Sequence, residues 1–140
     1  MTSTNASNNS HYSAIIIGAG QAGLSMSYCL KQKGIDHLIL EKSNALASNW
    51  RHQRWDSFCL VTPNWQCQLP GFNYAGDDPN GFMVKEQIID YIESYAASFN
   101  PPVVFNCPVL SLSQNPNTHT FTIVTTQQTY TAKQVIIASG

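Results

Sequence analysis

Three glycines near the N-terminus have the types and spacing that could bind a diphosphate. They form a G-x-G-x-x-G pattern, which consists of Gly18, Ala19, Gly20, Gln21, Ala22 and Gly23. In such a pattern the first glycine permits a tight turn, the second lets a pyrophosphate approach the backbone, and the third lets the following helix pack closely on the strand. The backbone amides at the start of that helix would then hold the anion, helped by the helix dipole.

An acidic residue follows at the distance expected for a nucleotide site. Glu41 lies eighteen positions after Gly23, where a carboxylate would accept hydrogen bonds from an adenosine ribose diol and repel a 2′-phosphate. The site therefore suits FAD or NAD better than NADP. No Lys or Arg lies between Tyr12 and Leu30, which excludes a P-loop because that motif needs a lysine directly after its last glycine.

The elements around the glycines form a strand–helix–strand unit. Residues 12–17 (YSAIII) and 37–40 (HLIL) are short apolar runs, which are typical of strands buried on both faces. Residues 21–33 predict a helix that ends at Gly34. The three segments form a βαβ unit, whose crossover is right-handed in nearly all known cases.

The rest of the chain predicts one more helix and several strands. Residues 84–99 carry an apolar stripe at helical spacing and are stopped by Asn100 and two prolines. Strands are expected at 103–105 and 108–113, followed by a hairpin from 120–124 that turns near Gln127 and Gln128 and returns through Tyr130, and finally a buried strand at 134–138. Residues 42–83, between the βαβ unit and the helix at 84–99, predict a long aromatic-rich loop layer. Residues 1–11 predict a disordered tail.

Composition narrows the classes of partner. The 140 residues are about one domain's worth of chain, and 43% of them are hydrophobic. A net charge of −1 gives no electrostatic reason to expect nucleic acid or an anionic membrane surface as a partner. The first residues do not resemble a signal peptide, and no aliphatic run is long enough to span a bilayer. The four cysteines and four histidines are scattered, which favours reduced thiols in the cytoplasm over a disulfide framework or a metal site.

Several further segments resemble one family of flavoproteins. They are the motif GAGQAGLS, the pair Glu41-Lys42, the segment from Trp50-Arg51 through RWDS to Thr62-Pro63, the LPGF run and the terminal ASG. Together they resemble the N-terminal part of the flavin-containing monooxygenase-like flavoproteins, including the CzcO-like branch. The resemblance covers nearly the whole chain from Tyr12 to Gly140.

The resemblance implies a cofactor, a fold and a set of site residues. It implies an α/β, Rossmann-like, three-layer FAD-binding domain at residues 12–140, with a mostly parallel sheet of order 3-2-1-4 and an antiparallel hairpin region. It places FAD contacts on Gly18, Ala19, Gly20, Gln21, Ala22, Gly23, Glu41, Lys42, Trp50, Arg51, Thr62, Val109, Ser139 and Gly140. It assigns no catalytic residue, because Pro63 stands about where some relatives carry an asparagine.

The resemblance also implies an activity and a missing part. Members reduce FAD with NAD(P)H and use dioxygen to oxygenate a small organic substrate. They carry a second glycine motif for the nicotinamide cofactor, and nothing in these residues matches it. We therefore expect an FAD-binding segment truncated before the NADP-binding domain, with an unpaired sheet edge where a last strand belongs.

Two other interpretations use the same glycine turn. An NAD-dependent dehydrogenase would bind the same adenosine diphosphate half through the same residues. A regulatory module would bind FAD or NAD without turnover. The glycines and Glu41 do not distinguish these alternatives, because all of the ligands share the adenosine diphosphate group.

Overall fold

The computed structural model describes residues 10–47, 68–73, 80–81 and 83–139. Six strands form one sheet in the order β5-β2-β1-β8-β7-β6. The first four of these are mutually parallel, namely β5 (Val103–Val104), β2 (His37–Leu40), β1 (His11–Ile17) and β8 (Thr129–Ile137). The last two, β7 (Phe121–Thr125) and β6 (Val109–Gln114), continue the sheet in antiparallel pairing. The predicted α/β class and the parallel order 3-2-1-4 are confirmed.

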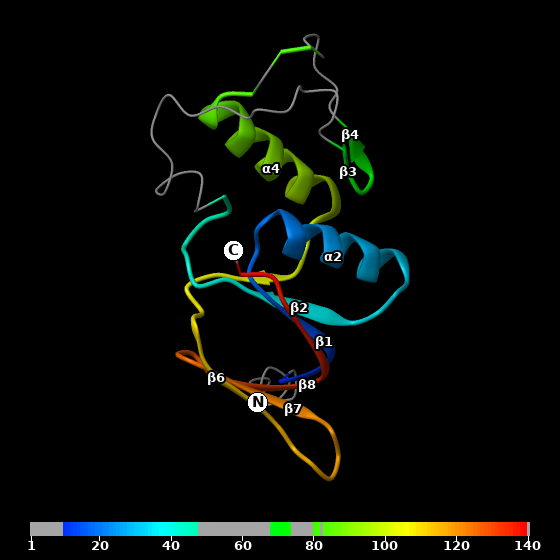
Figure 1. Ribbon diagram of the computed structural model, residues 1–140, viewed down its shortest axis with the longest axis vertical. Helices are drawn as coiled ribbons and strands as arrows, with labels where there is room; N and C mark the ends of the chain where they lie inside the picture. Colours follow the sequence, from blue (N-terminus) through cyan, green and yellow to red (C-terminus); the bar gives the residue numbers. More distant parts are fainter. Residues whose placement is uncertain (1–9, 48–67, 74–79, 82, 140) are drawn as a thin grey trace, which may run out of the picture.

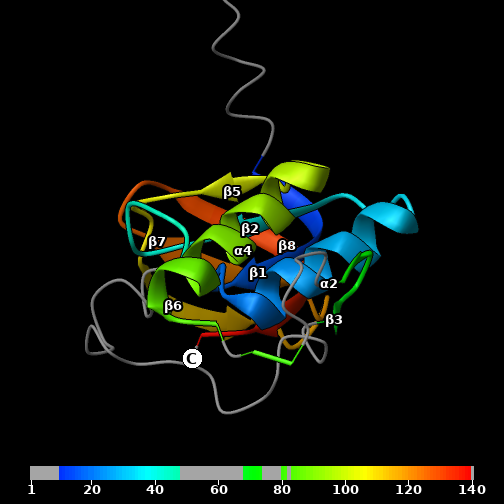
Figure 2. The same cartoon turned by 90° about the horizontal axis from the view of Figure 1, so that it is seen from above.

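Two helices cover one face of the parallel strands. Helix α2 (Gln21–Gln32) follows β1, and helix α4 (Lys85–Phe99) precedes β5. Both lie on the same side of the sheet, while β6 and β7 curl away on the other side (Figure 1). Seen from above, the two helices run next to each other over the sheet (Figure 2). The fold therefore has the three predicted layers of helices, parallel sheet and antiparallel strands.

The alternation of side chains along β1 and β2 builds two hydrophobic cores, one on each face. Ile16 and Ile39 point to the helix side, where they join a cluster that includes Ile92 of α4. Ile15 and Leu38 point to the opposite side, where they join a cluster with residues of β7 and β8. Successive side chains of a strand point to opposite faces, so an unbroken apolar run is what a strand buried on both sides requires.

The local sequence accounts for the ends of the helices. Gly34, with φ of 68°, follows the last turn of α2, as predicted for its C-terminal glycine. At the start of α4 the Val84 amide donates to Oε1 of Gln87 (3.0 Å). Helix α4 ends at Asn100, which adopts the left-handed conformation (φ 50°), and Pro101 follows. The predicted helix ends therefore hold to within a residue.

The C-terminal strands differ from the prediction. The hairpin return at Tyr130 and the strand expected at 134–138 are one continuous strand, β8. Its first half pairs with β7 and its second half with β1, with a short overlap at Thr131 and Ala132. The prediction separated them because the polar residues 133–134 interrupt the apolar pattern, but these residues are exposed on a strand that simply leaves one neighbour for another.

The end of β8 is open on one side. Within residues 10–47, 68–73, 80–81 and 83–139, the segment from Gln134 to Ile137 pairs only with β1, and Ile137 is 66% exposed. Among the described residues, this part of β8 therefore has no strand partner on the side away from β1.

The predicted loop layer contains a small hairpin that the sequence analysis missed. Strands β3 (Gln68–Leu69) and β4 (Phe72–Asn73) pair around Pro70 and Gly71. The hairpin packs on α4. The Tyr91 hydroxyl donates to the carbonyl of Phe72 (2.6 Å), and the rings of Tyr91 and Phe72 are in contact. Most of the remaining predicted loop and of the predicted N-terminal tail lies outside the described residues; β1 itself begins at His11.

Candidate functional site

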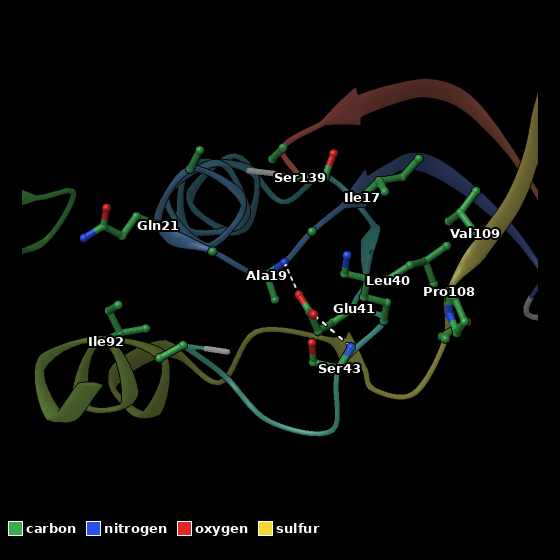
Figure 3. A pocket seen from close by; sticks show the side chains of 17 residues that line it. Ile17, Ala19, Gln21, Leu40, Glu41, Ser43, Ile92, Pro108, Val109 and Ser139 are labelled. Carbon is green, nitrogen blue, oxygen red and sulfur yellow. Dashed lines mark hydrogen bonds between the residues drawn. The ribbon is translucent and has the colours of Figure 1, made fainter. Parts of the chain in front are cut away.

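A cavity of about 500 Å³ opens at the carboxyl ends of β1, β2 and β8 (Figure 3). Its rim includes the start of α2 on one side and the segment after β5 on another. Open α/β sheets bind their ligands at this end of the strands, where the connections diverge. The strand ends are held together by two backbone bonds, from the Gly18 amide to the Leu40 carbonyl (2.9 Å) and from the Ala138 amide to the Ile17 carbonyl (2.8 Å).

Gly18 and Gly23 shape the turn by close backbone contact. Gly18 has φ of 109°, and a Cβ built there would lie 2.7 Å from the carbonyl oxygen of Ala138. A Cβ at Gly23 would lie 1.9 Å from the carbonyl oxygen of Gly18. A side chain at either position would displace backbone, so these glycines are required by the fold itself.

Gly20 differs from its two neighbours in the motif. A Cβ at Gly20 would meet no atom of the described residues within 4 Å, and its φ of −82° suits any residue. Gly20 lines the cavity and stands at the N-cap of α2. The fold tolerates a side chain here, so the advantage of glycine lies in the space that it leaves for something else.

The start of α2 has backbone amides without a capping side chain among the described residues. Leu24 donates the first helical hydrogen bond, to the Gly20 carbonyl (2.9 Å), which leaves the preceding amides of the first turn without a helical acceptor. No side chain caps these amides among the described residues, and the first turn contains no acidic residue. Free amides and the positive end of the helix dipole favour a negatively charged group at this position.

Glu41 lies next to the glycine turn that leads into α2, and backbone amides hold its carboxylate from two directions. Its Oε1 accepts from the Ala19 amide (2.8 Å) and its Oε2 accepts from the Ser43 amide (2.9 Å), as Figure 3 shows. Each carboxylate oxygen can accept two hydrogen bonds. One acceptor position therefore remains on each oxygen, which matches a pair of adjacent hydroxyl groups.

The remaining side of the cavity is apolar. Cys107, Pro108 and Val109 line it, and the segment is attached to the end of β2 by bonds from the Asn106 amide to the Ser43 carbonyl and from the Cys107 amide to the Glu41 carbonyl (both 2.9 Å). Ile92 contributes from α4. An apolar wall next to a carboxylate and free amides suits a ligand with a flat ring at one end and a charged group at the other.

The structure brings together most of the site residues predicted from the sequence. Nine of them line the cavity: Gly18, Ala19, Gly20, Gln21, Ala22, Glu41, Lys42, Val109 and Ser139. Gly23 lies behind the turn, buried against Gly18, and acts on the site through packing. Trp50, Arg51, Thr62 and Gly140 lie outside the described residues.

Sequence reasoning missed several residues that line the cavity. They are Ile17, Leu40, Ser43, Ala47, Ile92, Cys107, Pro108 and Ala138. Ser43 directly follows the predicted pair Glu41-Lys42, and Cys107 lies just before the predicted Val109. Both could have been found by extending the predicted set along the chain. Ile92 could not have been found in this way, because its helical spacing indicates a packing face equally well. Ile92 both packs in the helix-side core and lines the cavity.

The described residues give no sign of a metal site or a membrane span. Among them, no group of three His, Cys, Asp or Glu side chains could hold a metal ion. No helix in the described part of the chain is long and apolar enough to cross a membrane. Cys29 is an exposed free thiol and Cys107 a buried one.

Comparisons with known proteins agree with this geometry. The profile of a family described as pyridine nucleotide-disulphide oxidoreductase matches residues 15–140. The chain is 42% identical to an "uncharacterized oxidoreductase CzcO-like" of Geobacillus kaustophilus (strain HTA426) over 90% of its length and 35% of that protein. It is 39% identical to the indole-3-pyruvate monooxygenase YUCCA6 of Arabidopsis thaliana over 74% of its length and 24% of that protein.

A solved structure extends the similarity to the fold. The flavin-containing monooxygenase from Stenotrophomonas maltophilia superposes with a TM-score of 0.83 and 26% identity, covering 93% of this chain and 38% of that one. The expected resemblance to CzcO-like and flavin-containing monooxygenase-like proteins is confirmed. The chain spans only about a third of the length of these relatives.

Proposed function

The chain belongs to the pyridine nucleotide-disulphide oxidoreductase family, and from this premise we propose that it is the FAD-binding part of an NAD(P)H-dependent flavoprotein monooxygenase. The FAD-binding domain would begin with β1 at His11 and not at Tyr12 as the sequence predicted, and the residues before it would form a tail. The nicotinamide site would belong to chain beyond these residues, as the greater length of the relatives suggests. The proposed compartment is the cytoplasm, where NAD(P)H is available and free thiols stay reduced.

The observation that carries the proposal is the pairing, in one cavity, of a set of hydrogen-bond donors at the start of α2 with a pair of acceptors on Glu41. The uncapped amides of α2 and the open space at Gly20 fit a diphosphate. The free acceptor positions of Glu41 fit the ribose diol next to it, and the negative charge disfavours a 2′-phosphate. The residues present therefore fit the adenosine diphosphate half of FAD.

Each group of the chain would have a defined role toward that half. The α2 amides would bind the pyrophosphate, Glu41 would orient the ribose, and Pro108 and Val109 would exclude water from the adenine. Lys42, which is exposed at the rim, and Ser139 would contact the outer part of the ligand. Trp50, Arg51, Thr62 and Gly140 are proposed as further contacts on the basis of the resemblance alone.

The bound cofactor would supply the redox chemistry. That chemistry would be the acceptance of a hydride from NAD(P)H and the reduction of dioxygen, with one oxygen atom entering a small organic substrate and the other leaving as water. Monooxygenase names among the relatives support this reaction class.

The visible absorption spectrum of the purified protein tests the proposal. We expect flavin absorbance near 450 nm on the order of one FAD per chain, either as isolated or after addition of FAD. A protein that takes up no FAD under either condition would contradict the proposal. Titration with NAD in place of FAD separates an NAD-dependent dehydrogenase, and stopped-flow reduction by NADPH separates an enzyme from a binding module.

A further inference from the structure

One wall of the cavity depends on a segment with an unusual backbone. The segment 105–109 consists of the connection between β5 and β6 and the first residue of β6, and three of its residues, Cys107, Pro108 and Val109, line the cavity. Within this segment Asn106 has φ of 55°, in the left-handed region that residues other than glycine rarely adopt. Such a conformation persists only where its surroundings hold it.

A side chain from another part of the sheet holds this conformation. Gln127 lies in the turn between β7 and β8, and its Nε2 donates to the carbonyls of both Phe105 (3.0 Å) and Asn106 (2.8 Å). The amide nitrogen of glutamine carries two hydrogens, so each carbonyl can receive one. The amide oxygen in the same place would repel both carbonyls, which determines the orientation of the group.

The turn that carries Gln127 is itself well anchored. The Gln127 amide donates to Oγ1 of Thr125 (3.1 Å), and the Thr126 amide donates to the carbonyl of Pro108 (3.3 Å). The turn and the segment 105–109 are therefore joined at three carbonyls, two of them through one side chain. Figure 1 shows this turn in orange between β7 and β8.

From this geometry we infer that Gln127 is a positioning residue for the adenine side of the nucleotide site. It does not line the cavity. Gln127 donates to the carbonyls of Phe105 and Asn106, directly before the wall residues. It thereby holds Cys107, Pro108 and Val109 against the end of β2, where the Cys107 amide donates to the Glu41 carbonyl. The inference rests on the proposed function for the nature of the ligand, but not for the position of the wall.

The test compares variants that differ in donor capacity. Gln127→Met keeps the length of the side chain and removes the donors, whereas Gln127→Lys keeps donors on a flexible stem. Gln128→Met is the matched control, because Gln128 is equally exposed in the same turn and no side-chain bond to the wall is present there among the described residues. Amide hydrogen exchange at Asn106 and Cys107 measures the wall without ligand, with β1 amides as the internal reference.

Binding of ADP and of FAD, measured by calorimetry at a temperature where every variant is folded, gives the second readout. We expect Gln127→Met to exchange faster at Asn106 and Cys107 and to bind ADP about fivefold more weakly. Gln127→Lys should restore most of both, and Gln128→Met should match the parent protein.

Two results would overturn the inference: unchanged exchange in Gln127→Met, or faster exchange with unchanged ADP affinity. Equal losses of amide protection and of ADP affinity in the Met and Lys variants would also contradict it. That result would mean that the shape of the glutamine side chain matters and not its hydrogen-bond donors. If the parent protein binds neither ADP nor FAD, the proposed function fails, and the exchange data still decide whether Gln127 holds the wall.

Discussion

Gly20 and Gly23 occupy the same turn, yet a side chain would have different consequences at the two positions. At Gly23 a Cβ would collide with the carbonyl of Gly18, whereas at Gly20 it would enter open space. The G-x-G-x-x-G pattern therefore combines glycines required by the fold with a glycine that keeps the anion site accessible.

We predict that Gly20→Val folds but loses FAD binding. The cost in stability should be at most about 1 kcal/mol, since valine is a poorer N-cap residue than glycine, while its branched side chain blocks approach to the α2 amides. Urea unfolding and FAD titration measure the two effects. Gly23→Ala is the matched comparison and should lose about 3 kcal/mol of stability through overpacking. Unchanged FAD affinity in Gly20→Val would remove the pyrophosphate assignment.

Glu41 has a structural role besides the ligand contact that we propose. Its oxygens accept hydrogen bonds from the Ala19 and Ser43 amides and so connect the glycine turn to the end of β2. We predict that Glu41→Ala weakens FAD binding by about 1–3 kcal/mol, the range for loss of a charged hydrogen bond. Glu41→Gln should also lower the stability of the ligand-free protein, because its NH₂ group must face one of two backbone N–H donors. Thermal unfolding without ligand and FAD titration test both statements. A ligand-free Gln variant as stable as the parent protein would show that the carboxylate does not organise the turn.

At the scale of elements, polar contacts join the two helices to each other, and others join β1 to the residue that precedes β2. Lys31, in the last turn of α2, donates from Nζ to the carbonyls of Phe99 (2.6 Å) and Asn100 (3.2 Å) at the end of α4. Lys31 therefore places its positive charge at the end of the neighbouring helix α4, whose own last turn contains no basic residue. Asp36, which precedes β2, accepts from the hydroxyl (2.6 Å) and amide (2.9 Å) of Ser13 in β1.

The Asp36 contact predicts an acid-dependent loss of stability. The hydrogen bonds from Ser13 lower the pKa of the Asp36 carboxyl below its usual value of 3.8. A lowered folded-state pKa contributes stability that is present above pH 3.8 and is lost as the pH falls through the folded-state value. We expect Ser13→Ala to reduce the drop in stability between pH 5 and pH 2, measured by urea unfolding at each pH. Parallel pH curves for the two proteins would contradict this.

At the scale of the whole molecule, the cavity joins parts that belong to different cores. Ile92 belongs to the helix-side core and Cys107 to the core on the hairpin side, and both line the same cavity. The cavity also joins the ends of β1 and β2, which are neighbours in sequence, to the end of β8, which is distant from both. A ligand bound there would therefore contact every layer of the fold at once.

We predict that FAD stabilises the entire fold and not just the glycine turn. At a free concentration of 100 times the dissociation constant, the gain should be about 2.7 kcal/mol. A single unfolding transition that shifts with FAD concentration would show this by calorimetry, and Gly20→Val should show no shift. A shift confined to part of the transition would mean that the ligand couples only to one layer.

The β1–α2–β2 unit and its site residues could be predicted because their contacts are local in sequence. The turn, the helix and the strand that carries Glu41 lie within about thirty residues, and the motif specifies where each must be. The boundaries of α4 were equally local, since Asn100 and the prolines stop it wherever it packs.

The sequence by itself therefore determined the glycine turn, the position of Glu41 after the second strand and the order of the parallel strands. Only the tertiary structure decided that β8 is one strand shared between β7 and β1, that Ile92 reaches the cavity, and that Gln127 braces Phe105 and Asn106 from more than twenty residues away. The physical reason is that these features depend on which surfaces meet after folding. A glutamine in a turn or an isoleucine on a helix has the same local pattern whether or not a partner lies across from it.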